Sequence, residues 1–124
     1  MIYSVGKIDA AVEQLDWAIR LFLDEKAYIP SITLAGASEE ILGAVLKEKS
    51  SFSQLKIKLS QEYKMSEAIV SQAHLNKTKN WLKHWTNLAD DEVTDIELEK
   101  ENVQYIARAL ANLVAHDRSF PPQG

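Results

Sequence analysis

Apolar residues recur with a helical period near both ends of the chain. Between residues 7 and 26, one helical face collects Ile8, Ala11, Val12, Leu15, Ala18, Ile19, Phe22 and Leu23, while the charged side chains fall elsewhere. Between residues 99 and 115, a second apolar face collects Val103, Ile106, Ala107, Leu110, Leu113 and Val114. Both patterns predict amphipathic helices.

The middle of the chain predicts three further helices. Residues 27–49 form the second, because Pro30 suits a first helical turn and Lys47 complements the dipole at the other end. Residues 51–63 fit a short strand or a short helix, and we favour the helix because no partner strand is evident. Ser66 is a candidate N-cap for a long helix that reaches about Leu88, before an acidic link.

These elements predict an all-α protein, a bundle of four to five helices. The 124 residues are close to the commonest size of one domain, so residues 1–124 are expected to form a single domain. Residues 1–6 and 118–124 fall outside the periodic segments, and we expect them to be peripheral tails.

Small residues form a strip along the second predicted helix. Gly36 and Gly43 lie seven positions apart, and glycine inside a helix costs about 1 kcal/mol relative to alanine. Something must therefore approach the backbone closely, and a tightly packed neighbouring helix is favoured over a ligand. Charged residues on these helices can form an inter-helix pair or line a pocket, so the candidate groove comprises Gly36, Gly43, Glu39, Glu40 and Arg20.

Composition and charge limit the environment and the partners. The chain has no cysteine, and its amino-terminal region lacks a basic start followed by an apolar run. We therefore expect a cytoplasmic protein without a signal peptide or membrane span. The net charge of −4 conceals a basic segment, residues 47–85, with eight lysines against three acidic residues, followed by an acidic block over residues 86–101. The basic segment can bind an anion such as RNA, although pairing within or between subunits is favoured.

The stretch "NKTKNWLKHW" carries the strongest candidate chemistry. On a helix, its polar stripe comprises Asn76, Asn80, Lys83 and Asn87, and a mostly apolar stripe beside it includes Trp81 and Trp85. Metal-independent RNA cleavage needs a base and cations near the phosphate, and His84 with Asn80 and Lys83 supplies these types. A solvated helix face is the more ordinary interpretation.

Other chemistry lacks its motif in this sequence. No two histidines stand at i and i+4, and no glycine-rich phosphate loop or nucleophile turn is present. We therefore predict no metal, no cofactor, and neither a serine hydrolase nor an NTPase.

The segments "AIRLFL", "YIPSITLAGASEEILG", "NKTKNWLKH" and "ALANLVAHDRSFPP" resemble small uncharacterised bacterial proteins of the HEPN-like helical type, from about residue 9 to residue 122. The resemblance implies a four- or five-helix bundle that commonly dimerises through helix packing. Ribonucleases of this superfamily carry an arginine and then a histidine after four to six intervening residues. Here Arg108 and His116 have seven residues between them, whereas Lys77 and His84 have six but replace the arginine with lysine.

The leading expectation is a non-catalytic dimeric module that binds a partner protein or a small ligand beside Gly36 and Gly43. The alternative is a HEPN-type metal-independent ribonuclease or toxin-like RNA-binding protein. Its first candidate residues are His84, Asn80 and Lys83, and its second candidates are Arg108 and His116.

Overall fold

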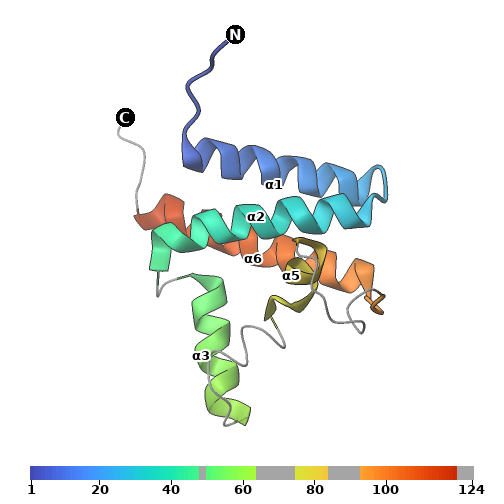
Figure 1. Ribbon diagram of the computed structural model, residues 1–124. Coiled ribbons are helices and arrows are strands. Elements are labelled where there is room, and N and C mark those ends of the chain that lie inside the picture. Colours follow the sequence, from blue (N-terminus) through green and yellow to red (C-terminus); the bar gives the residue numbers. More distant parts are fainter. Residues whose placement is uncertain (48–49, 64–74, 84–92, 120–124) are drawn as a thin grey trace.

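A computed structural model describes residues 1–47, 50–63, 75–83 and 93–119. These residues contain five helices and no strand (Figure 1), namely α1 (Lys7–Leu23), α2 (Tyr28–Leu46), α3 (Ser51–Tyr63), α5 (Lys77–Lys83) and α6 (Leu98–Ser119). The predicted all-α bundle of four to five helices is confirmed. The helix favoured over a strand at residues 51–63 is also confirmed, as α3.

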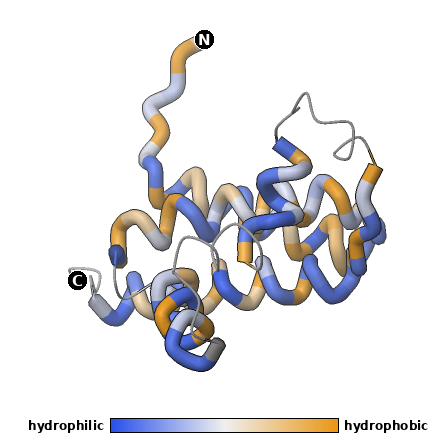
Figure 2. Tube along the Cα trace, turned by 60° about the horizontal axis from the view of Figure 1, so that its bottom comes forward, coloured by the Kyte–Doolittle hydropathy of each residue, from blue (hydrophilic) through white to orange (hydrophobic). Residues whose placement is uncertain are grey.

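Helix α2 is the centre of the bundle. Helices α1 and α6 both pack along it, whereas α3 and α5 contact it from the side away from α1 (Figure 1). Ala18, Ile32, Ala35 and Tyr105 form a buried cluster where α1, α2 and α6 meet. Residues 1–6 extend away from the helices in both views (Figures 1 and 2), and Met1, Ile2, Tyr3 and Val5 are exposed there.

Small residues let α1 and α2 pack closely. Ala11 and Ala18 of α1 and Ala35 of α2 are fully buried. Two serine hydroxyls of α2 donate hydrogen bonds to backbone carbonyls of α1, Ser31 Oγ to Ala18 O at 2.7 Å and Ser38 Oγ to Ala11 O at 2.7 Å. Buried hydroxyls need such partners, and these ones fix how α1 and α2 align.

The glycines of α2 make room on its other side. A Cβ atom at Gly36 would lie 2.7 Å from Cδ of Lys79, so the aliphatic stem of that lysine crosses α2 where no side chain obstructs it. A Cβ atom at Gly43 would meet Asn112 Nδ2 at 3.4 Å and Ser50 Cβ at 3.5 Å, which is ordinary contact. Side chains from other parts of this chain therefore account for the close approach at the small-residue strip.

By length and composition alone, α2 is apolar enough to cross a membrane. This is weak evidence for a membrane span, because core helices of soluble bundles share these properties. Helix α2 buries Ser31, Ser38 and Glu39, and each of them has a hydrogen-bond or ion-pair partner within the bundle.

The long helix predicted over residues 66–88 is interrupted at Asn76, because Leu75 has π-helical geometry and the α-helix α5 begins at Lys77. Residues 77–83 of that prediction are helical, as α5, and its residues 66–74 and 84–88 lie outside the described residues. The interruption has a physical cause, since the hydroxyl of Tyr105 stands between two backbone groups that an uninterrupted helix would join directly.

Helix α6 buries a different face from its apolar one. Val103, Leu110 and Val114 of the predicted apolar face are 53%, 41% and 49% exposed. The buried positions of α6 are instead mostly polar, namely Asn102, Tyr105, Arg108, Ala109 and Asn112. The amides of Asn102 and Asn112 donate to α2 carbonyls, at 3.0 Å to Tyr28 O and 3.2 Å to Glu39 O. These bonds turn the polar face of α6 inward and leave Val103, Leu110 and Val114 outside, while Ile106 of the predicted apolar face packs partly buried against the core.

Candidate functional site

A cluster of charged side chains joins α2, α5 and α6. Glu39 of α2 is buried, and its Oε2 lies 2.5 Å from Nε of Arg108 on α6. Lys79 of α5 reaches both carboxylates of α2, with Nζ 3.9 Å from Oε1 of Glu39 and 3.7 Å from Oε2 of Glu40. Lys83 Nζ lies 3.1 Å from the same Glu40 oxygen. Three cations therefore surround two carboxylates.

Tyr105 of α6 fixes where α5 begins. Its hydroxyl accepts a hydrogen bond from the backbone N–H of Lys79 at 3.1 Å and donates one to the carbonyl of Leu75 at 3.1 Å. In an uninterrupted helix the N–H of residue 79 would bond to the carbonyl of residue 75 directly. The phenol replaces that bond with two, so it holds the backbone from which Lys79 projects.

Arg108 supports the same backbone. Its Nη2 donates to the carbonyl of Leu75 at 3.1 Å, and its guanidinium lies over the ring of Tyr105, 4.5 Å from the centroid. A planar guanidinium can bind a carboxylate and a carbonyl while it stacks on an aromatic ring, which lysine cannot do. One arginine thus links Glu39 to the start of α5.

Burial shifts the pKa values of this cluster. Removal from water raises the pKa of Glu39 above 4.5, against the opposing effect of Arg108 and Lys79. Burial also lowers the pKa of Lys79 below 10.5, although both glutamates oppose that change. Desolvation acts on Glu40 too, but Lys79 and Lys83 outweigh it, so the pKa of this more exposed carboxyl is lowered. The enclosed ion pairs consequently carry a desolvation cost that the outer pair largely avoids.

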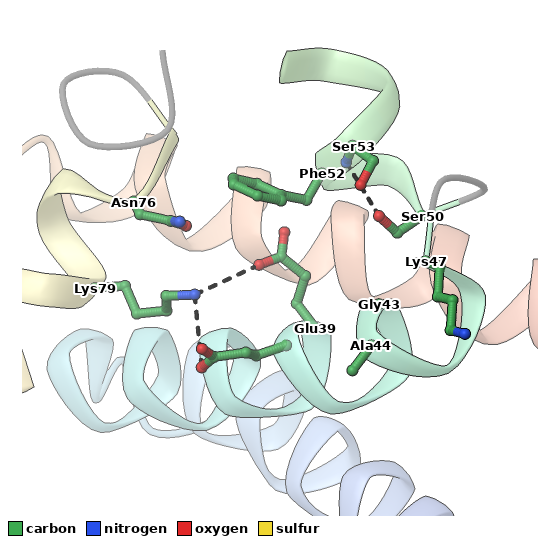
Figure 3. A pocket seen from close by; sticks show the side chains of 10 residues that line it. Glu39, Gly43, Ala44, Lys47, Ser50, Phe52, Ser53, Asn76 and Lys79 are labelled. Atoms are coloured by element: carbon green, nitrogen blue, oxygen red, sulfur yellow. Dashed lines mark hydrogen bonds and ion pairs between the residues drawn. The ribbon is translucent and has the colours of Figure 1, made fainter. Parts of the chain in front are cut away.

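A cavity of about 350 Å³ opens beside the cluster, between α2, the first turn of α3 and the start of α5 (Figure 3). In Figure 3, Lys79 extends from one end toward Glu39, Phe52 covers the opposite side from α2, and Asn76 points inward. Gly43 and Ala44 give α2 a low surface there. The cavity is also lined by Glu40, Lys47, Ser50 and Ser53.

The structure brings part of the predicted groove together. Glu39, Glu40 and Gly43 line the cavity, whereas Gly36 lies about two helical turns before Gly43, beneath the stem of Lys79. Arg20 is not brought to this site, because it is exposed on α1 and pairs with Asp16 at 3.1 Å. The cavity therefore lies beside the small-residue strip, without the predicted arginine.

Four of the five predicted catalytic residues lie in the described part of the chain, two on α5 and two on α6. Asn80 is exposed on α5, Lys83 is paired with Glu40, and His84 lies outside the described residues. Arg108 is buried against Glu39, while His116 lies in the last turn of α6 with Nδ1 3.5 Å from Asp117 Oδ1. Arg108 and His116 stand eight positions apart on one helix, about 12 Å along its axis, and the guanidinium of Arg108 is already engaged by Glu39.

Several residues of the site were missed from the sequence, among them Lys79 and Tyr105 of the charged cluster and Phe52 of the cavity. For α6 a signal existed, because Asn102, Tyr105, Arg108 and Asn112 are spaced by three or four residues and so share one face. A stripe that combines a tyrosine, an arginine and two amides can serve as a buried hydrogen-bonding face. Lys79 offered no comparable signal, because its burial depends on the glycine at position 36 of another helix.

Among the described residues, no group of three or more His, Cys, Asp or Glu side chains is placed to hold a metal ion. The chain matches no family model, no curated protein and no solved structure in the comparisons made. The cavity and its charges must therefore be interpreted from their own geometry. Chemically, they offer ammonium, amide and hydroxyl donors beside an apolar wall, which suits binding.

Proposed function

We propose that this protein is a small, non-catalytic interaction module of the cytoplasm, a HEPN-like bacterial helical bundle that acts as a homodimer. The observation that supports this proposal is the outward apolar face of α6. Together with α1 it lines an apolar groove of about 290 Å³, formed by Ile19, Phe22, Leu23, Val103, Ile106, Ala107 and Leu110. Exposed apolar surface of this kind marks an interaction site.

A second copy of the chain is the partner that suits this groove. In a two-fold symmetric dimer the same patch meets itself, so charged patches repel whereas an uncharged apolar patch is complementary to itself. The lining contains no charged side chain. Leu23 and Val103 are 65% and 53% exposed at its edges, so each copy offers projecting side chains as well as a groove.

The oligomeric state tests this proposal. We expect the purified protein to have about twice the 14.0 kDa mass of the chain in light scattering coupled to size exclusion. Leu110→Glu should give a monomer, because the new carboxylate would be buried against its symmetry mate. Gln104→Glu is the matched control, since it adds the same charge at an exposed position of α6 outside the groove. A monomeric wild type would refute the dimer.

The alternative function is a metal-independent ribonuclease or RNA-binding protein. It is favoured by the basic, solvent-facing side of α5, where Lys77 and Asn80 are exposed. This alternative predicts RNA cleavage by the wild type and its loss in His84→Ala. RNA that stays intact at high protein concentration would exclude the nuclease, and absence of binding near physiological salt would exclude the RNA binder.

A further inference from the structure

The amino-terminal arm, residues 1–6, carries large apolar side chains that the bundle leaves in solvent. The arm extends away from the helices (Figures 1 and 2), and none of its six residues has a charged side chain. Four of its residues are 73–104% exposed, namely Met1, Ile2, Tyr3 and Val5. Single exposed apolar side chains are common on soluble proteins, whereas a contiguous group of them indicates an interaction surface.

The two sides of the arm differ in polarity. Gly6, where the arm joins α1, has extended dihedral angles, with φ −82° and ψ 147°. In an extended segment, side chains two positions apart point to the same side, so Met1, Tyr3 and Val5 share one side. The other side contains Ser4 and Gly6 as well as one isoleucine. The arm can therefore present three large apolar side chains together to a partner.

The apolar groove of α1 and α6 suits this side of the arm. Its lining contains no charged side chain, and its volume of about 290 Å³ lies just below the range of small-molecule pockets, about 300–1,000 Å³. A groove of this size fits one or two side chains of a peptide better than a whole ligand. Leu23, Val103 and Leu110 are 65%, 53% and 41% exposed in the groove. An arm seated there would remove apolar surface of both partners from water.

The arm of the same chain is poorly placed to fill this groove. Ile19, the first groove residue of α1, lies about 18 Å along the helix axis from Lys7, where the arm begins. Tyr3 stands four positions before Lys7, which is at most about 14 Å of extended chain. The backbone of Tyr3 would therefore fall short of Ile19 even if the arm turned back along α1.

The arm of a second copy can reach the groove. The apolar face of α1 continues toward its amino end, because Val12 stands seven positions before Ile19 and is 38% exposed. Two α1 helices that pack antiparallel through Val12 place Lys7 of one copy beside residue 17 of the other. That position is only about 3 Å along the axis from Ile19, so the arm passes over the groove.

We propose, building on the homodimer proposed above, that two copies exchange their amino-terminal arms, each seating Tyr3 and Val5 in the α1–α6 groove of the partner. The exchange satisfies two-fold symmetry, because each copy gives one arm and receives one.

Disulfide trapping tests where the arm is seated. The chain has no cysteine, so introduced thiols are the only ones present. Tyr3→Cys protein is mixed with ¹⁵N-labelled Val103→Cys protein, oxidised, and weighed by mass spectrometry without reductant. A disulfide requires Cα atoms within about 7 Å, so we expect a species of one light and one heavy chain. Gln104→Cys is the matched control for Val103→Cys, because it is exposed beside the groove without lining it, and should give at least tenfold less of this species.

Single charges on the arm test which of its sides enters the groove. Tyr3→Asp would place a carboxylate in an apolar groove, so the dimer dissociation constant, measured by analytical ultracentrifugation, should rise at least tenfold. Ser4→Asp is the matched control, because it adds the same charge one position along, on the other side of an extended arm, and should change the constant less than threefold. Both positions precede α1, so neither variant should alter the helix content seen by circular dichroism.

The outcomes separate the exchange of arms from the dimer itself. A monomeric wild type would refute both. A dimeric wild type without the mixed disulfide, or with equal yields from Val103→Cys and Gln104→Cys, would refute the exchange and leave the dimer. A disulfide within one chain that carries both Tyr3→Cys and Val103→Cys would place the arm in its own groove. Equal dissociation constants for Tyr3→Asp and Ser4→Asp would show that the side with the tyrosine is not the one seated.

Discussion

Helix α2 is attached to its neighbours by different chemistry on its two sides. Toward α1 it presents small residues and two serine hydroxyls that bind backbone carbonyls. Toward α5 and the buried face of α6 it presents glycines and a carboxylate, which are matched by lysine and arginine. The side toward α1 presents only neutral groups, whereas the side toward α5 and α6 contains charged groups that are buried away from water. Buried charges are a costly means of stabilisation, so their presence favours a role in binding.

The largest effect should follow from loss of one partner in the buried ion pair. Arg108→Met leaves the carboxylate of Glu39 buried without its closest cation, and also removes a donor from Leu75 O. We expect the free energy of unfolding, measured by urea denaturation, to fall by about 3–5 kcal/mol.

The double variant Glu39→Met, Arg108→Met is the control for that prediction. It removes both charges and retains side-chain volume, so it should be more stable than Arg108→Met alone. If the single variant proved as stable as the wild type, the ion pair would contribute nothing and the contrast between the two sides of α2 would disappear.

The two glycines of α2 should respond differently to alanine. At Gly36 the new methyl would lie 2.7 Å from Cδ of the buried Lys79 side chain, so Gly36→Ala should destabilise by about 1–3 kcal/mol through overpacking. At Gly43 the nearest atoms are at 3.4 and 3.5 Å, so Gly43→Ala should be neutral or stabilise by up to about 1 kcal/mol. Thermal unfolding of both variants measures the difference. Equal effects would show that the stem of Lys79 does not restrict α2.

Two substitutions that each remove one hydroxyl extend this comparison, Tyr105→Phe beside α5 and Ser38→Ala beside α1. Tyr105→Phe deprives the N–H of Lys79 and the carbonyl of Leu75 of a partner, and should cost about 1–3 kcal/mol. Ser38→Ala removes one donor from a carbonyl within α1 and should cost about 1 kcal/mol. Amide hydrogen exchange at Lys79 should accelerate in Tyr105→Phe alone. Unchanged exchange there would mean that the phenol does not protect this amide.

The helices could be predicted from the sequence, and so could the buried face of α1, where Ala11, Leu15 and Ala18 are buried as expected, but the buried face of α6 could not. The apolar period located α1 and α6 correctly, because periodicity reports that a helix is amphipathic. It does not report which face meets the core, and in α6 the amides of Asn102 and Asn112 and the charge of Arg108 bind α2 instead. Partners for such groups come from distant positions in the chain. Glu39 and Arg108 were therefore both candidates, yet their pairing could not be derived.

Glu40 should give the smallest effect and the clearest dependence on pH. Its carboxyl is 59% exposed and pairs with Lys83 and Lys79, and these partners lower its pKa below 4.5. Because its pKa is lower in the folded state, Glu40 adds stability above about pH 4.5 and loses it as pH falls through the folded value.

Exposed ion pairs contribute about 0–1 kcal/mol, so Glu40→Gln should reduce stability at pH 7 by no more than that. The difference between wild type and variant should vanish in acid and shrink with added salt, as urea titrations across pH can measure. A difference that instead grew in acid would mean that the carboxyl, like that of Glu39, has its pKa raised in the fold, and Glu40 would then belong to the enclosed part of the cluster.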